Sequence, residues 1–320
     1  MNRPPTPEDN ANAAIRFGLA CGVGTYLIWG LFPVYIKMLD GVAAMEIVAQ
    51  RIVWAAPLGA LLLSARGQWR ETLIAVRSPR VLGLLLLSAF VIGANWLIYV
   101  WAVANDRVLE ASLGYYINPL IFVAAGVFIL KEQLTRAQIA AVAMAGVGVC
   151  ILTIGAGVFP WPSLMLAFSF TVYGYIRKTT PVGAMPGLFI ETMLLSPIAL
   201  AYLFWMSRQG MLAFGGGDAS LTLLLIAAGP MTVVPLLLFA LSARRLRLST
   251  VGFLQYIGPT GQLFLGLYYG EAFTIYHGIC FSLIWAALAL TTWDALRRNN
   301  AEKKAARAAI IQTVSATPKN

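Results

Sequence analysis

The sequence predicts an all-α integral membrane protein with ten transmembrane helices, arranged as two inverted five-helix repeats. Three observations lead to this prediction. Of the 320 residues, 59% are hydrophobic and only 11% are charged, whereas soluble domains carry about 25% charged residues. Apolar stretches of about 20 residues, the length that crosses a hydrocarbon core about 30 Å thick, follow one another with short connections. Matching motifs also recur at a separation of 140 residues.

The predicted spans follow the apolar stretches. The segment before the first span is polar and rich in Pro, and it lacks the form of a cleavable signal, so we expect the first span to remain as an anchor. We expect disorder at both ends of the chain, over residues 1–12 and 299–320. The ten predicted spans cover residues 16–38, 43–65, 80–103, 109–130, 135–154, 160–178, 185–206, 219–241, 248–268 and 274–294.

The basic residues predict the orientation. If the N-terminus is cytoplasmic, 19 of the 23 Lys and Arg residues lie on the inner side, Arg51 lies within a span, and only Lys37, Arg107 and Arg208 lie outside. Cytoplasmic loops collect Lys and Arg, so both termini are predicted to be cytoplasmic. The net charge of +10 therefore reflects topology and not a nucleic-acid partner. The basic tail fits either a solvated stop-transfer end or a contact with anionic lipid.

The residues that would carry enzyme chemistry are missing. Cys21, Cys150 and Cys280 each stand alone in an apolar stretch, which predicts neither disulfides nor a metal site. The sequence has one histidine, His277, and no GxxxxGK[ST], HExxH or CxxC motif. We therefore predict no catalytic residue, no metal and no cofactor. Two alternatives to a transporter stay open: a membrane-embedded enzyme acting on a lipid-linked substrate, and a permease subunit of a larger complex.

The repeat is visible in two motifs, "YYINPL" (115–120) and "QYIGPT" (255–260). A second Pro pair, Pro57 and Pro197, has the same separation. Each half contains five spans, an odd number, so the second half enters the membrane inverted, as in many secondary transporters. We expect an N-terminal tail (1–15), a first repeat (16–154), a second repeat (155–296) and a basic tail (297–320).

Proline within a span removes a backbone hydrogen bond and presses on the preceding turn. Unpaired backbone is tolerated at membrane depth mainly beside protein or a wet cavity. The side chains of the two motifs therefore either line a central cavity or bond across a packed kink. The candidate cavity residues are Tyr115, Tyr116, Asn118, Gln255 and Tyr256, and the predicted helix-break residues are Pro57, Pro119, Pro197 and Pro259.

Other polar residues fall within the spans. Arg51 and Glu191 are ionisable, and they either line the cavity or have a structural role, as an Arg51–Glu191 pair or through a bond of Arg51 to Glu46 along one helix. Arg51 suits an anionic or polar substrate group, and Glu191 is the candidate proton carrier. Asn95 is either a bond between helices or a pore-facing donor, and the neighbouring Trp96 is a further cavity candidate.

Six stretches together carry a family resemblance: "YLIWGLFPVYIK" (26–37), "GANWLIYVWAVAN" (93–105), "EASLGYYINPL" (110–120), "FIETMLLSP" (189–197), "LLLIAAG" (223–229) and "RLRLSTVGFLQYIGPT" (245–260). The sequence resembles the RarD proteins of the EamA branch of the drug/metabolite transporter superfamily. The resemblance implies a bacterial inner-membrane carrier with ten helices and no cofactor, whose partners are the lipid bilayer and a small-molecule substrate. It also favours outward transport of a metabolite or drug and leaves a homodimer open.

Overall fold

The computed structural model describes residues 7–130, 135–157, 159–243, 245–246 and 254–316, and these residues form helices and connecting turns with no strand among them. The prediction of an all-helical membrane protein is confirmed to this extent. Each predicted span overlaps a helix, whereas a count of ten crossings stays a prediction. Seven described helices are long and apolar enough to cross a membrane: Ala13–Lys37, Ala44–Arg66, Pro79–Ala104, Arg136–Gly155, Ala184–Arg208, Ala219–Ser242 and Ile275–Asp294.

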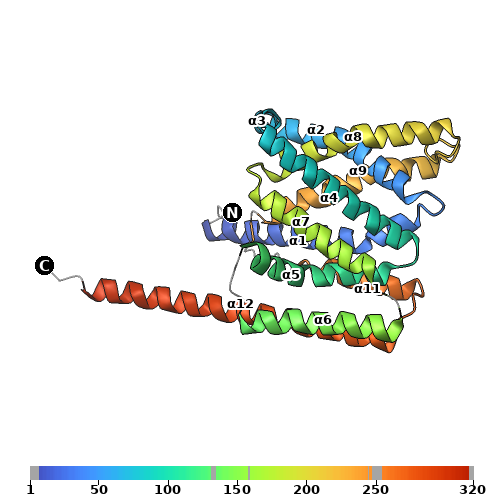
Figure 1. The fold of residues 1–320 in the computed structure, drawn as a ribbon. Helices are drawn as coiled ribbons and strands as arrows, with labels where there is room; N and C mark the ends of the chain where they lie inside the picture. The colour runs from blue at the N-terminus through green and yellow to red at the C-terminus, as the bar shows by residue number, and fades with distance from the viewer. Residues whose placement is uncertain (1–6, 131–134, 158, 244, 247–253, 317–320) are drawn as a thin grey trace, which may run out of the picture. The chain divides into compact units, whose positions relative to one another are not determined.

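The chain divides into two compact units, which we describe separately. The first comprises residues 1–118 and 161–272, and the second comprises residues 119–160 and 273–320. The boundary falls within α5 (Val108–Leu130). The other helices of the first unit are α1 (Pro7–Lys37), α2 (Ala44–Arg66), α3 (Trp69–Arg77), α4 (Pro79–Ala104), α7 (Trp161–Thr179), α8 (Ala184–Arg208), α9 (Ala219–Ala243) and α11 (Ile257–Tyr268) (Figure 1).

Helices α2 and α8 pack against each other and run antiparallel (Figure 1). Near the start of α2, Glu46 accepts hydrogen bonds from the backbone N–H groups of Ala213 and Phe214, which lie beyond the end of α8. In α3, just after α2 ends, Glu71 accepts a 2.6 Å hydrogen bond from the N–H of Gly183, which precedes α8. At each end of this helix pair, a buried or partly buried carboxylate therefore connects the two helices by hydrogen bonds to backbone.

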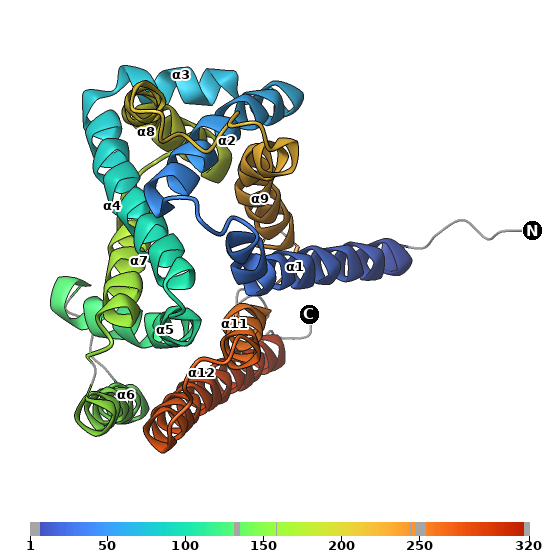
Figure 2. The ribbon, with the colours of Figure 1, turned by 90° about the vertical axis from the view of Figure 1, so that its right-hand side faces the viewer.

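The remaining helices of the first unit pack around this pair. α2 lies between α8 and α9, α1 packs against α9 and α11, and α4 packs against α7 and α8 (Figure 2). At one end of the bundle, Lys37 pairs with Asp106 and Ser163 Oγ donates to Glu110 O. We call this the Lys37 end, and we call the opposite end, where α3 lies, the Arg177 end. One continuous apolar core joins these helices and includes Ile36, Ile47, Val100, Ala111, Leu166, Leu195 and Leu225.

Close helix approach depends on glycine at two crossings. A methyl group on Gly229 of α9 would lie 2.3 Å from Trp54 O of α2, closer than any side chain can come to backbone. At the crossing of α1 and α11, a methyl group on Gly30 would lie 3.2 Å from Gly258 O. Gln262 Nε2 also donates to Trp29 O there, at 3.0 Å. Through these contacts, residues 29–33 of α1 ("WGLFP") pack against the "QYIGPT" motif.

The second unit is built from α6 (Arg136–Ala156), α12 (Ile275–Ala316) and the second half of α5. Thr135 and Gln138 form a reciprocal capping box at the start of α6, and Thr135 Oγ1 also donates to Asp294 Oδ2 of α12. α6 and α12 pack side by side along this pairing (Figure 1).

The expectation of disorder at both chain ends is wrong for residues 7–12 and 299–316, which are helical. The tail segment "AEKKAARAAI" consists of strong helix formers, and a helix that continues an existing one needs no new nucleus. Residues 1–6 and 317–320 lie outside the described residues.

The connection between the predicted spans 43–65 and 80–103 contains the short amphipathic helix α3. Its exposed apolar residues are Trp69, Leu73, Ile74 and Val76, and its charged residues are Arg70, Glu71 and Arg77. The sequence reading missed α3 because nine residues are too few to qualify as a span. The helix ends of α2 and α4 bracket it: Gly67 adopts a left-handed conformation (φ 63°) after α2, and Pro79 is the first residue of α4.

The four prolines predicted to break helices differ in their surroundings. α2, α5 and α8 continue through Pro57, Pro119 and Pro197. Pro259 instead lies in the first turn of α11, directly after a turn at Gln255 and Tyr256. The first turn of a helix tolerates proline because its N–H groups have no partner within the helix.

Candidate functional site

The guanidinium of Arg51 lies inside the first unit, enclosed by aromatic rings. Arg51 is 8% exposed, and its Nε donates a 2.6 Å hydrogen bond to Thr232 Oγ1 of α9. Its Cζ lies 4.9 Å from the ring centroid of Phe32 and 4.5 Å from that of Trp96. These contacts are cation–π interactions, which stabilise a charge that has lost part of its water.

Three tyrosines pack against these rings. The Tyr35 ring lies 5.4 Å from Phe32, and the Tyr99 ring lies 5.9 Å from Phe32 and 5.8 Å from Tyr115. Tyr35 OH donates to Leu224 O at 2.9 Å, whereas the buried hydroxyl of Tyr99 has no hydrogen-bond partner among the described residues. We call the set Phe32, Tyr35, Trp96, Tyr99 and Tyr115 the Arg51 cage.

The charge of Arg51 is not balanced by an acid in the part of the chain that the structure describes. Neither of the suggested partners contacts it: Glu46 binds the backbone beyond α8, and Glu191 pairs with Arg177. The structural pairs left open by the sequence are therefore not formed among these residues. Burying an ion without a counter-ion is costly, so an unpaired buried Arg is an unusual feature that requires an explanation.

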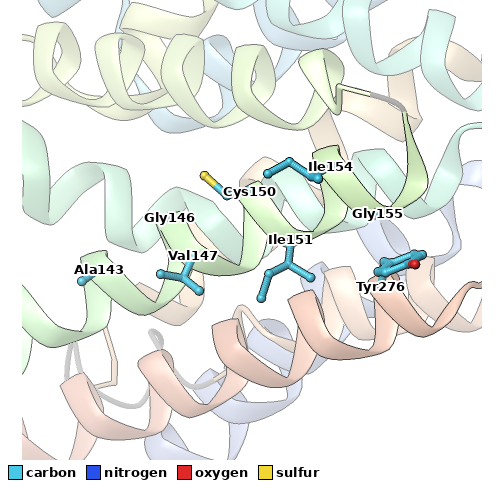
Figure 3. Close-up of a pocket in the computed structure, with 8 residues that line it drawn as sticks. All are labelled: Ala143, Gly146, Val147, Cys150, Ile151, Ile154, Gly155 and Tyr276. Carbon is cyan, nitrogen blue, oxygen red and sulfur yellow. The ribbon is translucent and has the colours of Figure 1, made fainter.

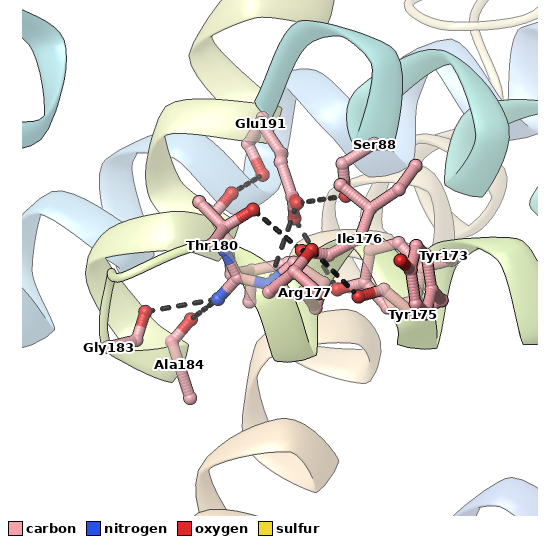
Figure 4. A network of polar contacts seen from close by, with 12 residues as sticks. Ser88, Tyr173, Tyr175, Ile176, Arg177, Thr180, Gly183, Ala184 and Glu191 are labelled. Atoms are coloured by element: carbon pink, nitrogen blue, oxygen red, sulfur yellow. Dashed lines mark hydrogen bonds and ion pairs between the residues drawn. The ribbon is translucent and has the colours of Figure 1, made fainter. Parts of the chain in front are cut away.

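Glu191 lies in a separate polar network at the Arg177 end (Figure 4). It is 1% exposed, and its Oε1 accepts a 2.6 Å hydrogen bond from Ser88 Oγ and lies 3.7 Å from Arg177 Nε. Tyr173 OH donates to Oε2 at 3.4 Å. Arg177 Nη2 in turn donates to Gly183 O at 3.0 Å. The network thus connects a buried carboxylate to the α7–α8 connection.

Arg51 and Glu191 occupy equivalent places in their helices. Each is the eighth residue of its helix, α2 or α8, and the two positions are 140 residues apart. Because α2 and α8 are antiparallel, the two residues lie toward opposite ends of the bundle.

The two Pro motifs meet within the first unit. Tyr116 and Tyr256, which are 140 residues apart, stack with ring centroids 6.3 Å apart and an interplanar angle of 15°. Tyr116 OH and Thr260 Oγ1 are 2.5 Å apart, and Ser112 Oγ donates to Pro259 O at 2.8 Å. The two motifs are therefore in direct contact.

The remaining candidates have simpler surroundings. Asn95 Nδ2 donates to Leu166 O at 3.0 Å and to Ser169 Oγ at 2.9 Å, so it bonds α4 to α7. Asn118 Oδ1 accepts a 3.2 Å hydrogen bond from Thr171 Oγ1 of α7. Gln255 is partly buried in the turn before α11. Of the candidates, only Arg51, Trp96 and Tyr115 come together in the cage.

The sequence reading missed residues that matter in both sites. Arg177 was counted with the cytoplasmic charges, and nothing in a single sequence shows that its side chain turns inward. Tyr99 had a usable signal, because it follows Trp96 by three residues and so shares a helix face with it. Thr232 is an uncharged residue in an apolar helix, and the sequence gives no signal that it contacts Arg51.

A pocket of about 710 Å³ lies along α6 and α12 in the second unit (Figure 3). Its lining is mostly apolar, and it includes the side chains of Val147, Ile151 and Ile154 together with Cys150 and Tyr276. Ile154, which lines it, is 83% exposed. An apolar surface of this kind on a membrane-spanning helix is solvated by lipid, and it lacks the polar groups that orient a substrate. The candidate site therefore lies in the first unit.

Comparisons with known proteins agree with a membrane transporter fold. Residues 16–154 match the model of the EamA-like transporter family. The Protein RarD of Streptomyces exfoliatus is 44% identical over 95% of this chain and 98% of its own. The Protein RarD of Escherichia coli (strain K12) is 43% identical over 88% and 95%, and an uncharacterized transporter of Vibrio cholerae is 42% identical over 90% and 96%.

A solved crystal structure has a similar fold, with a TM-score of 0.56 at 20% sequence identity, and the match covers 87% of this chain and 98% of that one. Together with the apolar helices, these findings define a multi-pass helical membrane protein of a transporter class. The chain belongs to the EamA-like transporter family and, within it, to the RarD-type proteins.

Proposed function

We propose that this protein is a secondary transporter that exports a small organic metabolite or drug across the bacterial inner membrane. Transport would proceed by alternating access between two inverted halves, residues 16–154 and 155–296, with both termini in the cytoplasm. Inverted repeats supply two conformations of similar energy, which alternating access requires.

The observation that carries the proposal is the pairing of helix contacts inside the first unit. If the halves are equivalent, α1 corresponds to α7, α2 to α8 and α4 to α9. Under this correspondence, the contact between α1 and α9 predicts a contact between α7 and α4. The contact between α2 and α9 likewise predicts a contact between α8 and α4. Both members of each pair are present. The stack of Tyr116 on Tyr256 adds a contact between equivalent residues.

We further propose that Glu191 couples transport to protons. The carboxylate is buried and held by Arg177, whose guanidinium also binds Gly183 O and Ala184 O. Protonation would cancel the charge attraction between Glu191 and Arg177 and free the guanidinium. Proton uptake would thereby change the contacts of the α7–α8 connection, which is the type of local change that a gradient-driven carrier needs.

A metabolite comparison tests the function. Cells that lack the protein are compared with cells that overproduce it, and cells overproducing an unrelated inner-membrane protein to the same level serve as the control. We expect at least one small organic compound to fall inside the overproducing cells and to rise in the medium. Unchanged profiles across growth conditions would contradict export, and a rise inside the cells would reverse the direction.

A further inference from the structure

We propose that the Arg51 cage binds the oxyanion of a small aromatic solute, a carboxylate or a phosphate, and thereby sets the substrate class of the transport proposed above. The inference rests on that proposed function but concerns binding, which can be measured without transport.

The first support is the bonding of the guanidinium. Its Nε is occupied by Thr232 Oγ1, and rings of Phe32 and Trp96 lie within 5 Å of Cζ. No described residue accepts a hydrogen bond from Nη1 or Nη2, and no described carboxylate lies within 4 Å. The free donors of an Arg form a planar fork that matches a carboxylate or phosphate. A bound oxyanion would supply the missing counter-ion.

A second, independent support is the hydroxyl of Tyr99. It is buried without a partner among the described residues, on a side chain that is only 4% exposed and whose ring packs on Phe32, the ring that Arg51 covers. A buried polar group left unpaired is costly, and each such group in a native protein needs an explanation, of which a bound ligand is one. An oxyanion on the guanidinium would accept the O–H of Tyr99 as a third donor.

The rings around the site favour an aromatic body on the solute. Trp96 and Tyr115 are partly exposed and pack at the edge of the core cluster, so they can stack on a planar guest. Aromatic cages often bind cations, but here the protein's own guanidinium occupies that role. A quaternary ammonium or a neutral amide would leave the charge of Arg51 unbalanced, and both are excluded as guests of this site.

The position of Arg51 favours a soluble guest over lipid. Arg51 is the eighth residue of α2, roughly 10 Å along the helix from its start. A lipid headgroup offers the same phosphate chemistry, so the test below includes a lipid arm. We commit to the soluble solute.

The test is a binding titration of the purified, full-length protein in a neutral detergent, followed by the shift in its melting temperature. Benzoate and phenyl phosphate are the oxyanion probes. Benzamide and benzyltrimethylammonium share the ring but lack the negative charge, and a short-chain phosphatidylglycerol represents the lipid source. We expect both oxyanion probes to raise the melting temperature in a saturable manner and the other three to have no saturable effect.

The variants locate the binding site. Arg51→Gln should weaken benzoate binding by about 10-fold or more, since it removes charge-assisted hydrogen bonds. Tyr99→Phe should weaken binding by roughly 3- to 10-fold while leaving the melting temperature of the free protein unchanged or raised, because it removes an unpartnered hydroxyl. The matched control is Arg107→Gln: Arg107 also lies over a Trp ring, that of Trp101, but pairs with Glu110 at 2.7 Å.

Each result decides the inference. If benzamide binds as well as benzoate, if only the lipid binds, or if neither oxyanion binds, the inference is overturned. Should Arg51→Gln prove too unstable to purify, an unweakened Tyr99→Phe would overturn it alone. Binding that behaves as expected in a protein that fails the metabolite comparison would leave the oxyanion site standing and remove the export function.

Discussion

At the scale of single residues, the two buried ionisable groups differ in how their charge is balanced. Glu191 has Ser88, Tyr173 and Arg177 as partners, whereas Arg51 has one hydroxyl and a set of rings. The Glu191 carboxylate thus has a counter-ion and two hydroxyl partners, although Nη1 of Arg177 has no hydrogen-bond partner among the described residues. Arg51 has no counter-ion among the described residues and can therefore bind an anionic ligand. For this reason we assign substrate contact to Arg51 and proton coupling to Glu191.

The coupling role predicts the behaviour of Glu191→Gln. Gln retains the shape and most hydrogen bonds but cannot titrate. We expect the variant in proteoliposomes to lose transport driven by a pH gradient and to retain exchange of substrate at equilibrium. The measurement is substrate flux with and without the gradient.

The matched control is Glu46→Gln, because Glu46 is equally buried (1%) but bonds only to backbone N–H groups. It should keep gradient-driven flux in the fraction of protein that folds. Wild-type gradient-driven flux in Glu191→Gln would rule out Glu191 as the proton carrier.

Glu271 predicts a pH dependence of stability. It lies between α11 and α12, and its carboxylate accepts the N–H groups of Val108 and Leu109 at the start of α5. Burial raises the pKa of the Glu271 carboxyl above its usual value, and these two hydrogen bonds oppose the shift. A raised pKa means that the folded protein binds the proton of Glu271 more tightly than the unfolded chain does. The stability that the bound proton contributes is therefore lost as the pH rises through the pKa of the folded state.

We therefore expect the melting temperature of the wild type to fall, relative to Glu271→Gln, as the pH rises from about 4 to about 7. Thermal unfolding of the wild type and of Glu271→Gln in the same detergent across this pH range measures the difference. A difference between wild type and Glu271→Gln that stays constant with pH would refute the assignment.

At the scale of helices, the crossing of α2 and α9 depends on the absence of a side chain at Gly229. Gly229→Ala would place a methyl group against Trp54 O, and separating the helices should reduce the free energy of unfolding by about 1–3 kcal/mol. Gly83→Ala in α4 is the matched control, since nothing lies within 4 Å of its added methyl group; it should be neutral or slightly stabilising. Thermal unfolding in detergent measures both, and equal melting temperatures would contradict the close approach.

The sequence predicted the helices well and their side-chain contacts poorly. Helix ends follow from local apolar length and from caps such as Gly67 and Pro79, so the predicted bounds of α2 and α4 differ from the observed ones by one residue. Partners such as Thr232 for Arg51, or Arg177 for Glu191, depend on packing between distant helices. The contact of Tyr116 with Tyr256 was not predicted either, because a matching spacing of 140 residues in the sequence does not say which side chains touch.

At the scale of the whole molecule, the charge pattern predicts the orientation in the membrane. Reporter fusions after residues 70 and 246 should report cytoplasm, and fusions after residues 107 and 212 should report periplasm, because translocating clustered Lys and Arg is unfavourable. Within the first unit, residue 70 lies in α3 at the Arg177 end, and residue 107 lies beside Asp106 at the Lys37 end. Reversed signals at these four sites would overturn the topology.

The two carboxylate ties on α2 and α8 restrict how the first unit can deform. Glu46 holds the segment after α8, and Glu71 holds the residue before it, so neither end of the pair can separate without unpairing a charged acceptor from backbone. We expect α2 and α8 to move together as a rigid body during any transport cycle. Sliding between α4 and α7, or between α1 and α9, would then supply the displacement. An engineered cross-link between α2 and α8 should leave the rate of transport intact, whereas one between α4 and α7 should arrest it.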